Sequence, residues 1–194
     1  MKPPARSPGR LPGPPPDAAR LREAALNHLA RFAASEASVK AVLMRRIARW
    51  ASRAAQAGLA TAEIERIAQS ARAALPDIMI QLRTLGAVDD QAFAQSRVRR
   101  LARGGKSRQA SLAHLIAKGV DPDLAAASLP PDPARDLASA CMLLRRRRLP
   151  PFGTGDRLKA LGVLARAGFE RAVAEQALNM EPDAAENLVR AARQ

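Results

Sequence analysis

Two segments of this chain carry the same residue pattern, 49 positions apart (107 to 156). Ser107 opens the first segment and Asp156 the second, and each is a helix-capping residue followed by an arginine. Leucines follow at helical spacing, Gly119 or Gly168 ends the helix, and a second apolar stripe begins. A unit that occurs twice predicts a helical repeat protein, and such repeats usually form contact surfaces rather than reaction pockets.

The composition favours helices throughout. Apolar residues make up 47% of the chain, which is enough for a sizeable core, yet there are only four Phe, one Trp and no Tyr. A core of Ala, Leu, Val and Ile suits closely packed helices, and strand-like runs bounded by Gly-Asn turns are absent. We therefore predict an all-α protein.

Proline and glycine divide the chain into four parts. Residues 1–16 are rich in proline and lack apolar periodicity, so we expect a disordered tail. Residues 17–75 are predicted to form a first helical repeat, and Pro76 marks the start of a second repeat at 76–129. Residues 130–194 follow a proline cluster and are predicted to hold a third repeat and a C-terminal helix.

The charge balance favours polyanionic partners or acidic protein surfaces. Lys and Arg total 32 against 18 Asp and Glu, for a formal net charge of +14. Basic residues gather on two predicted helices and on the glycine turn that follows the second one. The candidate phosphate- or filament-binding residues are Arg45, Arg49, Arg99, Arg103, Lys106 and Arg108. The run from Arg145 to Arg148 ends a predicted helix, where favourable interaction with the helix dipole explains it as well as a binding role does.

Few residues suggest catalysis or metal binding. His28 and His114 lie in helical segments without a neighbouring pattern that would activate them, and Cys141 lies in an apolar stripe typical of a buried structural thiol. The Asp89-Asp90 pair could bind a metal, but its place before an amphipathic helix favours capping. We predict no catalytic, cofactor or metal site, and hence no enzyme.

The chain is also expected to be a cytoplasmic monomer without a membrane segment. No stretch approaches the apolar length of a membrane span, and the N-terminus has no apolar signal core. A single cysteine cannot form an internal disulfide.

One central segment resembles a known family. Residues 85–94, Leu-Gly-Ala-Val-Asp-Asp-Gln-Ala-Phe-Ala, resemble the RecX family of regulators of the RecA recombinase. The similarity continues through Gly105, Arg108, Leu112 and Leu115 to Lys118-Gly119-Val120, and in weaker form it covers roughly residues 18–180.

This resemblance implies an elongated array of three-helix repeats that binds RecA filaments on single-stranded DNA. It implies inhibition of strand exchange and of ATP hydrolysis by RecA, hence a role in DNA repair, recombination and the SOS response, without catalysis by this chain. Contacts with single-stranded DNA would involve phosphates rather than bases. The alternative is a basic helix-turn-helix protein that binds duplex DNA and controls transcription, although no predicted helix carries Asn, Gln and Arg together on its exposed face.

Overall fold

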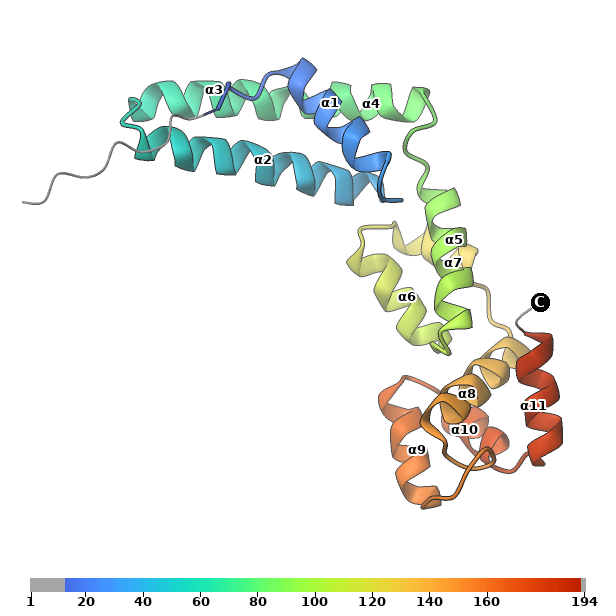
Figure 1. Cartoon of the computed structure of the whole chain (residues 1–194). Helices are drawn as coiled ribbons and strands as arrows, with labels where there is room; N and C mark the ends of the chain where they lie inside the picture. The colour runs from blue at the N-terminus through green and yellow to red at the C-terminus, as the bar shows by residue number, and fades with distance from the viewer. Residues whose placement is uncertain (1–12, 193–194) are drawn as a thin grey trace, which may run out of the picture. The chain divides into compact units, whose positions relative to one another are not determined.

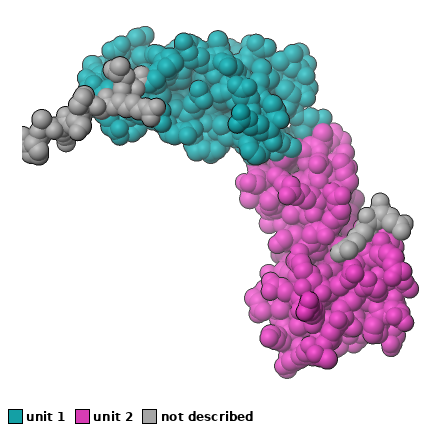
Figure 2. Space-filling model, in the orientation of Figure 1, with its two compact units in different colours: residues 1–90 teal, residues 91–194 magenta. Residues whose placement is uncertain are grey.

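The structure is a computed structural model that describes residues 13–192, and all regular structure in that range is helical. The chain divides into two compact units with the boundary between Asp90 and Gln91, and each unit is described by itself (Figure 2). The prediction of an all-α protein is confirmed across the described residues.

Unit 1 contains four helices around a main hydrophobic cluster, and a smaller cluster lies between α2 and α3. They are α1 (Ala18–Leu29), α2 (Glu36–Gln56), α3 (Thr61–Ala73) and α4 (Leu75–Thr84). The α2 and α3 helices form an antiparallel hairpin, which the positive φ of Gly58 allows at the turn (Figure 1). Buried aliphatic side chains hold the unit together, among them Leu21, Leu43 and Leu82 from three different helices.

The α4 helix belongs to this first unit, which corrects the predicted boundary at residues 75 and 76. Leu75, Ile78 and Leu82 of α4 are buried in the same cluster as residues of α1 and α2. The turn after α4 also buries Val88 in that cluster. Pro76 therefore lies in the first turn of a helix inside the unit, where its missing N–H costs nothing, and it does not mark a repeat boundary.

Unit 2 contains the second and third repeats. The second repeat consists of α5 (Asp90–Arg103), α6 (Arg108–Ala117) and α7 (Pro122–Ser128). The third consists of α8 (Pro133–Arg147), α9 (Arg157–Arg166) and α10 (Arg171–Leu178), and α11 (Pro182–Ala191) packs against α8 (Figure 1). Phe93, Val98 and Leu115 belong to the core of the second repeat, and Leu144 and Leu164 to that of the third.

The repeated sequence pattern corresponds to repeated geometry. Ser107 caps α6 and Asp156 caps α9, each through a side-chain oxygen that accepts a backbone N–H of the first turn. Gly119 and Gly168 both have φ of 80°, a left-handed conformation, which confirms them as the predicted helix-ending residues.

The arginine that follows each cap has the same role in both repeats. Arg108 Nε donates to the carbonyl of Leu129 at 2.9 Å, and Arg157 Nη1 donates to the carbonyl of Leu178 at 3.5 Å. Each carbonyl stands 21 residues after its arginine, at the end of the partner helix. The same 21-residue spacing thus places a hydrogen bond between the second and third helices of each repeat. We call this arginine–carbonyl bond the clamp.

The two repeats of unit 2 pack closely against each other. Ser107 Oγ donates to the carbonyl of Ala167 at 2.7 Å, and the backbone N–H of Arg108 donates to Asp136 Oδ1 at 3.0 Å. A Cβ added to Gly105 would lie 3.0 Å from both the backbone N of Leu143 and the carbonyl oxygen of Ser139. Glycine is required there because the loop after α5 approaches the backbone of α8.

The predicted disordered tail falls partly within the described residues. Residues 1–12 of that prediction lie outside them. Residues 13–16, by contrast, pack against unit 1: the carbonyl of Gly13 accepts a hydrogen bond from Trp50 Nε1 at 3.0 Å, and Pro16 is buried. The tail prediction is therefore wrong for these four residues, because the indole N–H provides a partner that composition alone does not reveal.

Candidate interaction surfaces

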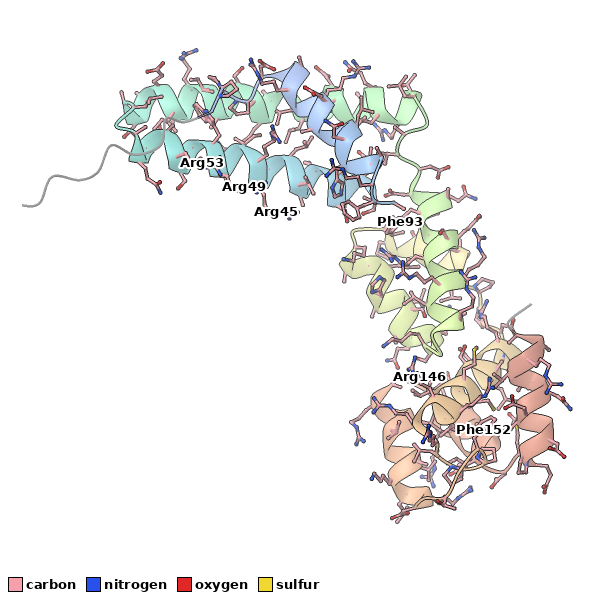
Figure 3. The ribbon with its side chains drawn as sticks, viewed as in Figure 1. Arg45, Arg49, Arg53, Phe93, Arg146 and Phe152 are labelled. Atoms are coloured by element: carbon pink, nitrogen blue, oxygen red, sulfur yellow. The ribbon has the colours of Figure 1, made fainter. Side chains whose placement is uncertain are left out.

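The first basic surface lies on α2 in unit 1. We call it the α2 arginine surface; it consists of Arg45, Arg46, Arg49 and Arg53, all of them exposed. Figure 3 shows Arg45, Arg49 and Arg53 following one another along the helix, as their four-residue spacing requires. Arg49 Nε donates to the carbonyl of Arg45 at 3.3 Å, and within residues 13–192 none of the four side chains forms an ion pair.

A pocket opens beside this surface. It has a volume of about 240 Å³, and it is formed where residues 13–16 meet α2. Its lining combines proline, tryptophan and arginine and holds no carboxylate: Gly13, Pro14, Pro16, Arg20, Arg46, Arg49, Trp50 and Arg53. Trp50 forms its inner wall and is only 7% exposed. This pocket could not be predicted from the sequence, because it depends on the position of residues 13–16.

The second basic surface lies at the end of α5 in unit 2. Arg99, Arg103 and Lys106 are exposed, and the first two line a groove of about 570 Å³ between α5, α8 and α11. Met142 and Leu188 contribute apolar lining to this groove. Its wall also holds one carboxylate, Asp132, and a further arginine, Arg135, which no sequence pattern indicated. The groove thus combines an apolar lining with a mostly basic rim.

Arg108 does not share this exposed surface, contrary to the expectation that it would join Arg99 and Arg103. Its side chain is half-buried, and its Nε is bonded to the carbonyl of Leu129. The glycine turn does place Arg108 after the same loop, but the guanidinium turns toward the partner helix. The sequence contained a signal for this, since Arg157 and Leu178 repeat the same spacing.

The arginine run at the end of α8 has several structural contacts. Arg145 forms an ion pair with Glu186 of α11 at 2.9 Å, and Arg146 Nη1 donates to the carbonyl of Gly104 at 2.8 Å. Arg148 adopts a left-handed conformation with φ of 53° at the end of the helix. These contacts favour the structural interpretation for Arg145 and Arg146.

Three residues were considered for catalysis, Cys141, His114 and His28, and their surroundings differ. Cys141 is buried, and burial raises the pKa of its thiol to about 11, which keeps it protonated at neutral pH. Burial and the charges of Arg97, Lys118 and Lys106 lower the pKa of His114, so its imidazole is neutral near pH 7. The His28 ring lies 5.3 Å from the Phe32 ring in a tilted arrangement.

One residue of the acidic pair, Asp90, contacts the N-terminus of a helix. Asp90 is the first residue of α5, and its Oδ1 accepts the backbone N–H of Glu36, the first residue of α2, at 2.8 Å. In the part of the chain that the structure describes, no group of three or more His, Cys, Asp or Glu side chains is arranged to hold a metal ion. None of the helices described is both long and apolar enough to cross a membrane.

Fold and surfaces together define a class: a helical-repeat protein whose exposed basic surfaces suit contact with an acidic partner. Residues 89–129 match the family model described as RecX, second three-helix domain, which coincides with α5 to α7. The chain is also similar to the regulatory protein RecX of Myxococcus xanthus (strain DK1622), with 28% identity over 172 residues that cover 84% of this chain and 86% of the relative. Both matches are to the RecX family, which agrees with the resemblance seen in residues 85–94. No solved structure gives a significant match.

Proposed function

We propose that this chain binds RecA filaments on single-stranded DNA and lowers recombinase and ATPase activity. The observation that carries the proposal is the match of residues 89–129 to the second RecX domain, within a similarity to a RecX regulatory protein that spans most of the chain. Because RecX proteins are regulators of RecA in DNA repair and recombination, the same partner is the leading expectation here.

The basic surface at the end of α5 is the proposed contact with the filament. Arg99, Arg103 and Lys106 are exposed and lie in or beside the matched domain. No ion pair within residues 13–192 involves Arg99 or Arg103, so both guanidiniums can meet acidic side chains or phosphates. The neighbouring groove, with apolar lining from Met142 and Leu188, offers a place for an apolar side chain of the protein partner. Arg45 and Arg49 are proposed to add phosphate contacts from unit 1.

The proposed mode of action is binding without catalysis. The protonated thiol of Cys141 is a poor nucleophile, and the positive groups around His114 disfavour the charged imidazolium. Regulation by contact needs no chemistry from this chain. Action on RecA filaments would take place in the cytoplasm, and one copy of the chain provides all the surfaces invoked, so a monomer suffices.

Co-sedimentation with RecA filaments tests this function. The source organism's RecA is assembled on single-stranded DNA with a slowly hydrolysed ATP analogue, and retention of the chain is measured against salt concentration. We expect saturable binding that is weaker for the Arg99→Ala/Arg103→Ala variant than for the wild type. The matched control is Arg166→Ala/Arg190→Ala, which removes the same charge from exposed positions of unit 2 outside the groove. Absence of retention on filaments would refute the proposal.

For the alternative of a sequence-reading transcription regulator, the α7 helix is a poor candidate for the recognition helix. A helix-turn-helix reader needs a second helix with base-contacting side chains, and α7 is seven residues long with the sequence PDLAAAS. Only Asp123 and Ser128 of that helix carry polar side chains, and the carboxylate would repel phosphates. Binding to duplex DNA that is as tight without RecA as with filaments would favour the alternative instead.

A further inference from the structure

The start of α9, in the third repeat, forms an exposed surface with a leucine at its centre. We call it the α9 surface; it consists of Gly155, Asp156, Arg157, Leu158 and Lys159, all of them exposed. Leu158 is 76% exposed, more than any other large apolar side chain that the structure describes. None of these residues lines the groove at the end of α5. We propose that the α9 surface docks on the RecA protein of the filament, at an apolar pocket bordered by acidic side chains, an inference that rests on the proposed function.

The equivalent surface of the second repeat is the one that holds the third repeat. A shift of 49 residues carries the start of α6 onto the start of α9 (108 to 157). Ser107 is 2% exposed there and donates to the carbonyl of Ala167 at 2.7 Å. Gln109 is the counterpart of Leu158, and a Cβ added to Gly168 would lie 3.2 Å from Gln109 Oε1. The start of the second helix in a repeat is therefore a contact surface within this chain.

A carboxylate from the following repeat completes this kind of contact. Asp136 of α8 accepts the backbone N–H of Arg108, the first residue of α6, at 3.0 Å. Asp90 of α5 accepts that of Glu36, the first residue of α2, at 2.8 Å. Among the described residues, no carboxylate from another helix accepts the backbone N–H of Arg157, the first residue of α9. The α9 surface thus lacks the acidic partner that its counterparts have.

The α11 helix stands at the right place in the sequence to cover this surface, but it packs elsewhere. Its first residue, Pro182, follows Pro133 of α8 by the same 49 residues (133 to 182). Ala185, the counterpart of Asp136, is buried and offers no carboxylate. The helix instead packs against α8, as Figure 1 shows. The α9 surface therefore stays exposed in the part of the chain that the structure describes.

The residues of the surface favour a different protein over a second copy of this chain. Ser107 donates its hydroxyl to a carbonyl of the next repeat, whereas an ionised Asp156 can only accept and would repel a carbonyl oxygen. A further repeat docked in the same way would present such a carbonyl.

The same residues disfavour nucleic acid as the occupant. Leu158 needs an apolar pocket, which a phosphate backbone does not provide, and a protein partner does. Arg157 and Lys159 flank the leucine with two positive charges, so acidic side chains at the rim of that pocket would complement them.

Photo-crosslinking tests which molecule docks on the α9 surface. The photoreactive residue p-benzoylphenylalanine is incorporated in place of Leu158 in the full chain, and in place of Ile116 in a control. Ile116 is 48% exposed and lies in α6, the counterpart of α9. Each protein is irradiated with RecA filaments on single-stranded DNA, and mass spectrometry identifies the adducts. We expect a RecA adduct from position 158 and little or none from position 116.

A charge placed at the same two positions measures the contribution of the contact. Leu158→Glu sets a carboxylate against the acidic side chains of the partner, and Ile116→Glu adds the same charge to the control position. Glutamate is favourable in the first turn of a helix, so Leu158→Glu should fold, which circular dichroism checks. We expect it to weaken retention on filaments at least about tenfold, from the loss of a buried leucine, and Ile116→Glu to change retention less than about twofold.

The outcomes separate this proposal from the proposed function. A RecA adduct confined to position 158, with weakening confined to Leu158→Glu, supports docking through the α9 surface. Adducts with DNA or with a second copy of the chain, no adduct, equal adducts from both positions, or equal retention of Leu158→Glu and wild type would overturn it. Those results leave filament binding intact as long as the wild type is retained. If the wild type itself is not retained, the proposed function fails and the docking proposal fails with it.

Discussion

The packing of the two repeats in unit 2 is most sharply tested at Gly105. This residue has φ of +64°, and an added Cβ would lie 3.0 Å from the backbone N of Leu143 and the carbonyl oxygen of Ser139. Both nearest atoms belong to the backbone of α8 and cannot move aside as a flexible side chain would. Gly105→Ala should therefore force the loop after α5 away from α8.

The size of the effect follows from two contributions. A left-handed conformation costs a residue with a Cβ about 1–2 kcal/mol. Overpacking against backbone adds about 1–3 kcal/mol, so the variant should lose about 2–5 kcal/mol of unfolding free energy. Gly86→Ala is the matched control: its φ is +65°, but an added Cβ would meet nothing within 4 Å, so only the first contribution applies.

Differential scanning calorimetry and urea unfolding followed by circular dichroism measure the difference. A unit of this size shifts its melting temperature by about 4–8 °C per kcal/mol. We expect Gly105→Ala to lower the melting temperature of its unit by at least about 4 °C more than Gly86→Ala lowers that of unit 1. Equal shifts for the two variants would refute the close approach between the loop and α8.

Three further predictions concern single residues and pairs. Arg108→Ala should cost about 1.5–3 kcal/mol in urea unfolding, because the carbonyl of Leu129 loses a charged donor, whereas Arg99→Ala should change stability by less than about 0.5 kcal/mol. An equal effect of the two would refute the clamp. Arg99→Ala/Arg103→Ala should keep the helical circular dichroism spectrum and flatten the salt dependence of filament binding; an unchanged slope would exclude these arginines from the contact. Cys141 should resist alkylation in the native protein at pH 8, with a rate that rises only toward pH 11 because the thiol ionises there, and rapid modification at pH 8 without unfolding would contradict its burial.

The local features of the fold could be predicted wherever the signal lay in neighbouring residues. Ser107 and Asp156 were identified as caps, and Gly119 and Gly168 as helix ends, because each feature depends on backbone geometry within a few residues. The burial of Cys141 followed from helical periodicity alone.

Features that depend on distant contacts were harder to predict. Pro76 resembled the start of a repeat, but α4 packs into the core that α1 and α2 form, and no local pattern reveals that partner. Residues 13–16 were assigned to a disordered tail because their composition does not show the hydrogen bond to Trp50. Arg108 was placed on the exposed surface because its acceptor, the carbonyl of Leu129, stands 21 residues away.

The candidate surfaces also contain some features that local sequence predicts and others that depend on distant packing. The exposure of Arg99 and Arg103 followed from the inward stripe of α5, and the structure places both at the rim of one groove. The groove itself could not be predicted, since it requires α8 and α11 to pack beside α5. Arg135 and the pocket beside Trp50 were missed for the same reason.

The central claim, regulation of RecA, is tested most directly by the rate of ATP hydrolysis. RecA is incubated with single-stranded DNA and ATP, and the chain is added from far below to equal molar amounts. We predict that hydrolysis falls at substoichiometric amounts of the chain. The Arg99→Ala/Arg103→Ala variant should require more protein for the same effect, whereas Arg166→Ala/Arg190→Ala should behave as the wild type. An unchanged hydrolysis rate at equimolar wild-type protein would contradict the inhibitory function.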